Sequence, residues 1–234
     1  MCKLFHPYEL NFSAAEVLRE ATLTVAYSFE NVSLLDDGPL GINGTGLNFG
    51  FDTSCRVNIC VSLINSPSYI QAAGLVLLGT SRQAHSFALW IKPTVVNQGT
   101  IIHLSQNSTG LGWCFPLVGF TSSSAIHAQY WNGSSINRPG PTITANAWTH
   151  VATTYSTTNG LRLWINGVQY GTSTGAFSYT APNAPIFVTI GSPINGQTCP
   201  SGAINQGEYS GYVDEFQLYS RELSSTNILN LANP

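Results

Sequence analysis

Two adjacent acids, Asp214 and Glu215, lie in the stretch GYVDEFQLYSREL (211–223), which is typical of a strand followed by a polar turn. Alternate side chains of a strand face opposite ways, so the pattern places Asp214 on the same face as Phe216 and Leu218. Glu215 then faces the other way, toward solvent. A carboxylate among core residues could act as half of a catalytic pair, ligate a metal ion, or form hydrogen bonds at the rim of the core.

A second kind of chemistry could come from Trp113, Tyr130 and Trp131, which lie in the loop-like or strand-end segments TGLGWCFPL and AQYWNGSS. Aromatic rings stack on the C–H faces of sugars, and neighbouring amides and hydroxyls can bind the sugar hydroxyls. We predict that these three residues form a ligand-binding group. The alternative is that the same rings pack beneath loops.

The chain has five cysteines and no CxxC pair, so the sequence does not predict a zinc site. Cys55 and Cys60 bracket four residues and could close a small hairpin, which leaves Cys114 and Cys199 for a long-range disulfide. Cys2 is then left over and could form an intermolecular bond. The histidines in or beside strand runs lack paired ligand spacing and are predicted to be structural: His85, His103, His127 and His150.

Surface chemistry favours a secreted or cell-surface protein. Only 8% of the residues are charged, against about 25% in a typical soluble domain. N-glycosylation motifs occur at Asn11, Asn31, Asn43, Asn107 and Asn132. The first residues, MCKLFHPYEL, lack the apolar segment of a signal peptide, so we expect a mature fragment or an excised domain.

Charge and hydropathy exclude two classes of partner. The net charge is −3 and no basic run is present, so nucleic-acid binding is not predicted. Apolar stretches are interrupted well before the roughly 18 residues that a transmembrane helix needs, so membrane insertion is not predicted either.

The elements that must position these residues are mostly strands. Ser13 followed by Glu16 forms a capping-box pattern, which predicts one short helix in an N-terminal extension of residues 1–21. From residue 22 to 234, short apolar or alternating runs are separated by Gly, Asn, Pro and Ser, as in an all-β sandwich. In SFALWIKP (86–93) both faces are apolar, so this strand should be central. No other helix of note is predicted.

Several motifs occur in an order typical of one known family. They are YSFE (27–30), LDDGPLGINGT (35–45), SFALWIKP (86–93), WTHVATTYS (148–156), LRLWINGVQYG (161–171) and the 211–223 stretch. The chain therefore resembles laminin-G-like domains of the concanavalin A-like jelly-roll superfamily over about residues 22–230. The resemblance implies a jelly roll of two antiparallel sheets with binding loops at one rim. It also implies a non-catalytic module that binds glycans or proteins.

The resemblance further implies a calcium ion between an early turn and the last strand. Asp36 and Asp214 match the acidic positions of that site, and Asn43 falls near a polar turn position. Calcium prefers six to eight oxygen ligands, which these side chains and nearby carbonyls could supply. The alternative is that Asp36 caps a turn and Asp214 binds backbone amides.

Catalysis is not predicted. Glycoside hydrolases need two carboxylates about 5 to 9 Å apart across the scissile bond. Enzymes of this fold typically carry Glu-x-Asp-x-x-Glu on one strand, and this chain has no such spacing. Nor does it contain the G-x-S-x-G elbow of a serine hydrolase. We therefore predict a secreted binding or adhesion module, with glycan or extracellular protein as partner. The alternative is a structural subunit of an extracellular polymer that self-assembles through the N-terminal extension.

Overall fold

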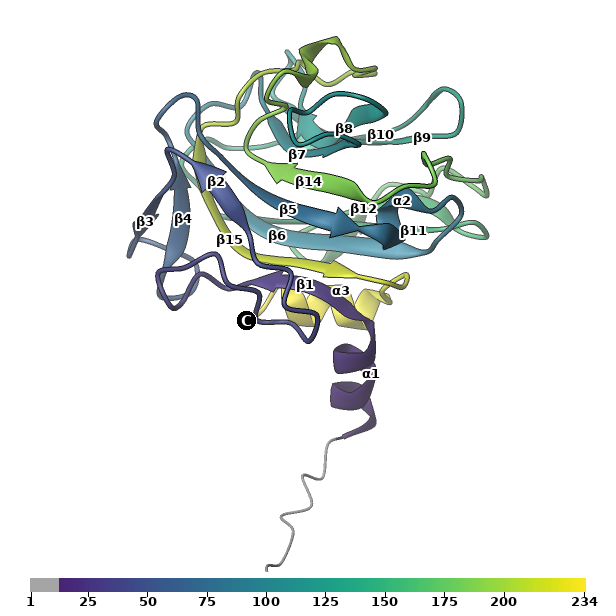
Figure 1. Ribbon diagram of the computed structural model, residues 1–234, viewed down its shortest axis with the longest axis horizontal. Coiled ribbons are helices and arrows are strands. Elements are labelled where there is room, and N and C mark those ends of the chain that lie inside the picture. The colour runs from purple at the N-terminus through teal and green to yellow at the C-terminus, as the bar shows by residue number, and fades with distance from the viewer. Residues whose placement is uncertain (1–12) are drawn as a thin grey trace, which may run out of the picture.

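In the computed structural model, which describes residues 13–234, two antiparallel sheets face each other across one core (Figure 1). The first sheet runs in the order β13 (Val168–Tyr170), β12 (Gly160–Ile165), β11 (Thr149–Ser156), β6 (His85–Pro93), β15 (Gly211–Tyr219), β4 (Cys60–Leu63), β3 (Gly50–Asp52), with β1 (Leu23–Tyr27) also paired to β15. The second runs in the order β10 (Ser135–Thr142), β9 (Ala125–Trp131), β8 (Cys114–Phe120), β7 (Thr100–Ser105), β14 (Ile186–Ile190), β5 (Tyr69–Leu75), β2 (Thr45–Leu47). The predicted all-β jelly-roll sandwich is confirmed.

The middle of the first sheet shows why the sequence pattern predicts this fold. β6 pairs with β11 on one side and with β15 on the other, which confirms its central position. Phe87, Leu89 and Ile91 enter the core between the sheets. Ala88 and Trp90 face the opposite way and are also buried. Both faces of the strand are covered, as its apolar alternation requires.

A tight hairpin joins β12 to β13. Asn166 and Gly167 have φ values of +49° and +81°, and Ile165 pairs directly with Val168. Asn and Gly tolerate this left-handed backbone, so the Asn-Gly pair specifies a two-residue turn.

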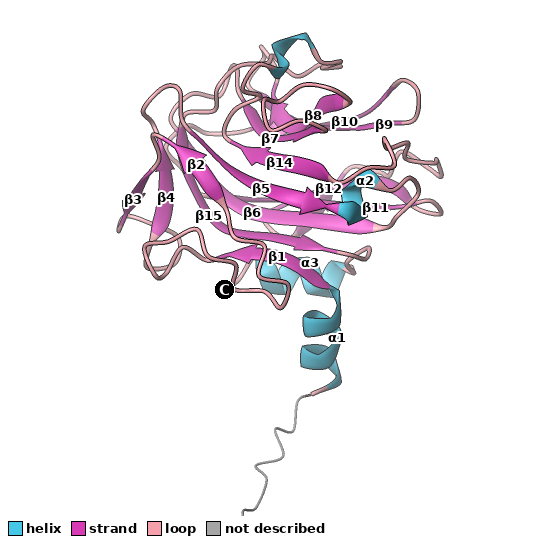
Figure 2. Cartoon of the chain, viewed as in Figure 1, coloured by secondary structure: helices cyan, strands magenta, loops and turns pink. Residues whose placement is uncertain are grey.

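Helices are few, but there are more of them than the sequence predicts (Figure 2). The predicted first helix is α1 (Ala14–Thr22), and its capping box between Ser13 and Glu16 is present. The prediction of no further helix of note was wrong, because α3 (Ser225–Leu231) begins with a second capping box and packs its buried Ile228 against the outer face of the first sheet. The remaining helical turns are short: α2 (Val76–Gly79) and η1 (Gly196–Thr198). Within residues 13–234, none of the helices combines the length and apolar character of a membrane crossing.

Candidate functional site

The acid pair lies at a β-bulge in β15. Glu215 has a φ of +49°, and the pairing of β15 with β6 shifts in register between Asp214 and Gln217. A bulge adds one residue to one strand, so side chains on its two sides no longer alternate in step.

The bulge changes which way Asp214 points. Val213 and Phe216 both pack in the core between the sheets. Asp214 pairs with Trp90 of β6, whose side chain lies outside that core cluster. The prediction that Asp214 shares a face with Phe216 was therefore wrong, because the bulge reverses the alternation between them. Glu215 is half-buried, so the prediction that it is an outward surface residue was wrong as well.

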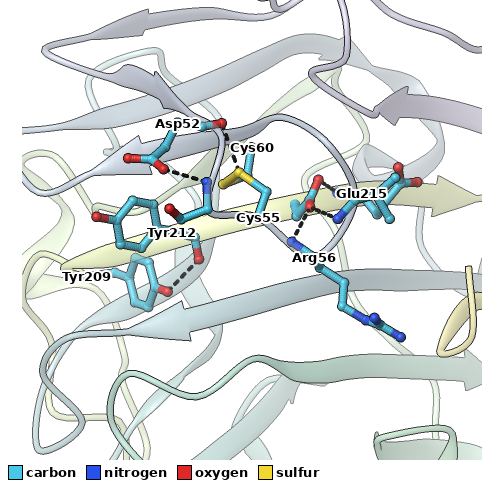
Figure 3. Close-up of a disulfide and its surroundings, with 10 residues drawn as sticks. Asp52, Cys55, Arg56, Cys60, Tyr209, Tyr212 and Glu215 are labelled. Atoms are coloured by element: carbon cyan, nitrogen blue, oxygen red, sulfur yellow. Dashed lines mark hydrogen bonds between the residues drawn. A yellow bond between two sulfur atoms is a disulfide. The ribbon is translucent and has the colours of Figure 1, made fainter.

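The Asp214 carboxylate binds backbone amides. It is fully buried and accepts hydrogen bonds from the amides of Arg56 at 3.1 Å, Val57 at 2.9 Å and Glu215 at 2.9 Å. Two of these amides belong to the short loop that the Cys55–Cys60 disulfide closes, and Figure 3 shows this loop lying against β15. Asp214 thus ties the disulfide loop to the last strand.

Asp36 has a similar role in a different segment. One carboxylate oxygen accepts the amides of Ala26 at 2.8 Å and Gly38 at 2.9 Å, and the other accepts the amide of Ile42 at 2.8 Å. Asn43 Oδ1 accepts the Asp36 amide at 2.9 Å. The structure therefore brings Asp36 and Asn43 together in one locked turn beside β1, while Asp214 binds a separate set of amides.

Other acids lie around Asp214. Burial, together with the nearby charges of Asp214, Glu30 and Asp37, raises the pKa of Glu215 to about 7. Burial likewise raises the pKa of Asp214 to about 6, although its three amide hydrogen bonds lower it. Glu30 has a buried Oε1 with no hydrogen-bond partner among the described residues. This region therefore concentrates negative charge away from water.

A calcium ion needs oxygen ligands that converge on one point. Across residues 13–234, no three acidic side chains place their ligand atoms within 4.8 Å of one another. The carboxylates of Asp36 and Asp214 instead satisfy six backbone amides between them. The calcium site at Asp36, Asn43 and Asp214 stays a prediction.

The structure brings two of the three predicted aromatic residues into one pocket. Trp113 and Trp131 are half-buried and line a pocket of about 330 Å³. The rest of the lining is mostly loop: Leu111, Gly112, Cys114, Thr198, Cys199 and Pro200. The rings come from the loop before β8 and from the end of β9, so two segments of the chain meet at this site.

Both predicted disulfides are present, Cys55–Cys60 and Cys114–Cys199. The second joins the start of β8 to the loop after η1, and both of its cysteines line the aromatic pocket. This disulfide therefore fixes one wall of the pocket. Cys2, the predicted intermolecular cysteine, lies outside the described residues.

Tyr130 does not belong to the pocket. Its side chain is fully buried, and its hydroxyl is hydrogen-bonded to His85 Nε2 at 2.8 Å. Its ring also stacks on those of His85 and Tyr155. The prediction of a ligand contact for Tyr130 was wrong. Tyr130 and Trp131 are consecutive in β9, so their side chains face opposite ways, and that of Tyr130 faces the core.

Polar residues beside the pocket were missed by the sequence argument. Gln129 is 1% exposed; its Nε2 donates to the carbonyl of Pro200 at 3.1 Å, and its Oε1 has no partner within residues 13–234. His127, on the same strand, bonds to Asn137 across β9 and β10 at 3.0 Å. The alternation in AIHAQYW places His127, Gln129 and Trp131 on one face, and that signal could have identified them.

The fold and the pocket define a class: a two-sheet jelly-roll sandwich with an aromatic recess between loops. The chain belongs to the concanavalin A-like lectin/glucanases superfamily, whose family model matches residues 65–229. No curated protein matches the sequence significantly.

Solved structures share the fold at low sequence identity. Domain 4 of AbnA, an extracellular arabinanase of Geobacillus stearothermophilus solved with arabinotriose, is 20% identical with a TM-score of 0.61, over 90% of this chain and 98% of that one. The binding domain of botulinum neurotoxin serotype G is 18% identical with a TM-score of 0.62, over 89% of this chain. A structure of botulinum neurotoxin type C, whose cell entry depends on interaction with two ganglioside molecules, is 13% identical with a TM-score of 0.59, over 92% of this chain. This chain spans about half of each neurotoxin chain, 50% and 51%.

Proposed function

We propose that this protein is a secreted, non-catalytic module that binds glycans in the pocket between Trp113 and Trp131. The observation that carries the proposal is the meeting of these two half-buried indole rings at one recess. A sugar ring has apolar C–H faces that pack on an indole, and hydroxyls at its edge that need hydrogen-bond partners. Thr198 offers a hydroxyl at the same pocket.

The neighbours support glycan as the ligand class. The arabinanase domain was solved with arabinotriose, and the type C neurotoxin depends on interaction with two ganglioside molecules for cell entry. Both ligands carry sugar rings. We extend this ligand class to the present chain because its pocket supplies the aromatic surface that such rings require.

Binding without catalysis is supported by the composition of the pocket. None of its lining residues in the described chain is acidic. Hydrolysis of a glycosidic bond generally needs a pair of carboxylates flanking that bond. We therefore expect a bound oligosaccharide to leave the site intact.

The first prediction is that Trp131→Ala and Trp113→Ala each weaken glycan binding at least tenfold, because central aromatic anchors contribute most of the energy of a binding site. Candidate ligands come from a glycan array, with arabinotriose as the first soluble probe for calorimetric titration. Tyr170→Ala is the matched control, since Tyr170 is exposed on the edge strand β13 and does not line the pocket. Undiminished binding in both tryptophan variants would exclude this pocket as the site.

Secretion is supported by the two disulfides, which form and persist in oxidising compartments. Asn31, Asn43, Asn107 and Asn132 are exposed, as glycosylation requires, while Asn11 lies outside the described residues. Asn132 follows Trp131 directly, and the Asn107 amide donates to the carbonyl of Leu111 in the pocket wall. Peptide mass mapping before and after enzymatic deglycosylation of secreted material would identify which of these asparagines carries glycan.

Calcium binding is a further part of the proposal, at a group of acids that shares only Asp214 with the site predicted from the sequence, and the support for it is charge. Glu30, Asp214 and Glu215 are neighbouring acids, and the Oε1 of Glu30 is buried without a partner among the described residues. A divalent cation would offset their repulsion, although these acids would have to converge further to ligate one ion.

The second prediction is that millimolar calcium raises the melting temperature of the chelator-treated protein, because a ligand that binds only the folded state stabilises it. The Glu30→Gln variant should show a smaller rise, and magnesium at the same concentration serves as the ion control. An identical melting temperature with calcium and with chelator would remove calcium from the proposal.

The alternative function, a self-assembling structural subunit, has one supporting observation. Val17 and Leu18 of α1 are exposed, and α1 projects away from the sandwich (Figure 1). Sedimentation with and without reductant separates the two functions, because a module that stays monomeric at all concentrations does not build a polymer.

A further inference from the structure

His103 lies beside the disulfide that lines the pocket. One of its ring nitrogens and the sulfurs of Cys114 and Cys199 all lie within 4.8 Å of one another. Within residues 13–234 this is the one group of three histidine, cysteine or acidic ligand atoms that are so close. The three residues come from β7, from β8 and from the loop after η1, so only the fold brings them together.

The imidazole of His103 has unused binding capacity. It is fully buried, its Nε2 is 2.9 Å from the carbonyl of Gly110, and its Nδ1 has no partner in the described chain. A neutral imidazole binds metal ions through a ring nitrogen that carries no proton.

The backbone at Gly110 and Gly196 lies unusually close to the His103 imidazole. A Cβ atom on Gly196 would lie 2.6 Å from His103 Nε2, so only glycine fits there without a shift. The Gly110 carbonyl that faces His103 is also 3.6 Å from the sulfur of Cys199. The η1 loop is therefore held directly against the imidazole and the disulfide.

We propose that His103, Cys114 and Cys199 form a zinc site once a thiol reductant opens the disulfide between the two cysteines. Two reductant thiols supply two electrons and two protons, so the S–S bond becomes two cysteine thiols and the reductant becomes its own disulfide. Zinc then binds as both thiols lose their protons to solvent.

The geometry suits this ion. Zinc binds sulfur at about 2.3 Å and imidazole nitrogen at about 2.0 Å, in a tetrahedron. Two sulfurs on one zinc lie about 3.8 Å apart, so the sulfurs of Cys114 and Cys199, which are bonded to each other in the disulfide, must separate after reduction while staying within the 4.8 Å that spans the group. Cys114 and Cys199 border the pocket, so a water molecule from the pocket can complete the tetrahedron. A site with three protein ligands and one open position results.

The test uses the full chain, reduced anaerobically with excess thiol and then freed of it, and titrated with cobalt(II) as a spectroscopic substitute for zinc. We expect one cobalt per chain, with the visible absorption of a tetrahedral thiolate site. We also expect zinc to displace the cobalt and to raise the melting temperature of the reduced protein by several degrees. Oxidised protein should show no such absorption.

Three variants separate this site from other thiols. His103→Gln should lose the tetrahedral spectrum, and so should Cys114→Ser with Cys199→Ser. The pair Cys55→Ser with Cys60→Ser should keep it, because that disulfide is not part of the group. Equal cobalt spectra in all variants, or none in the reduced wild type, would overturn the proposal. So would a reduced protein that circular dichroism shows to be unfolded and that zinc does not refold.

Discussion

Replacing Asp214 with alanine is expected to lower the free energy of unfolding by about 3 kcal/mol, because three backbone amides lose their acceptor at once. The side chain is fully buried, so no water takes its place without opening the structure. Two of its three partners, Arg56 and Val57, lie more than 150 positions away in the chain. The loss should therefore release the disulfide loop from the last strand. Urea denaturation at pH 7 measures the change in the free energy of unfolding.

Glu215→Gln is the matched variant for this experiment. In the wild type, the Glu215 carboxylate is flanked by Asp214 and Glu30, and it accepts one long hydrogen bond of 3.5 Å from Gln217. Removing this charge relieves repulsion, so we expect the variant to be as stable as the wild type at pH 8, or more stable. Comparable destabilisation by Asp214→Ala and Glu215→Gln would contradict the assignment of the amide-binding role to Asp214.

The pH dependence of stability should follow the same acids. The folded-state pKa values of Asp214 and Glu215 are raised to about 6 and about 7. In this range the folded protein binds more protons than the unfolded chain, so stability should fall as pH rises from 5 to 8. The Glu215→Gln variant should show a shallower decline, since its side chain does not titrate.

Much of the fold follows from local sequence. The β6 pattern specifies a central strand, the Asn166-Gly167 pair specifies a hairpin, and Ser13 with Glu16 specifies a helix start. In each case the determinants lie within a few residues of one another. The same kind of signal, Ser224 with Asn227, marks the start of α3, which the sequence argument overlooked.

The site was harder to predict because its determinants are not local. The alternation of side chains along β15 fails at Asp214, because a bulge with Glu215 in the left-handed region interrupts it. Nothing in the residues DEF predicts that bulge. Tyr130 and Trp131 look alike in sequence, yet Tyr130 is fully buried in the core, whereas Trp131 packs against the margin of the core and lines the pocket. The His103 group depends on three distant segments and has no spacing motif at all.

The two disulfides should contribute very differently to stability. Cys114 and Cys199 are 85 positions apart, and a loop of that length predicts a loss of about 4.5 kcal/mol when the bond is removed, on the chain-entropy estimate. Cys55 and Cys60 are 5 apart, which predicts a loss of about 2 kcal/mol. Paired Cys→Ser variants, compared by urea denaturation, measure both values.

The first pair should also affect binding, because Cys114 and Cys199 form part of the pocket wall whereas Cys55 and Cys60 do not. The second pair should instead couple to Asp214, since the loop that it closes donates two amides to that carboxylate. Removing the Cys55–Cys60 disulfide together with Asp214→Ala should therefore lower the free energy of unfolding by less than the sum of the two separate losses. Additive losses would show that the loop and Asp214 stabilise the last strand independently.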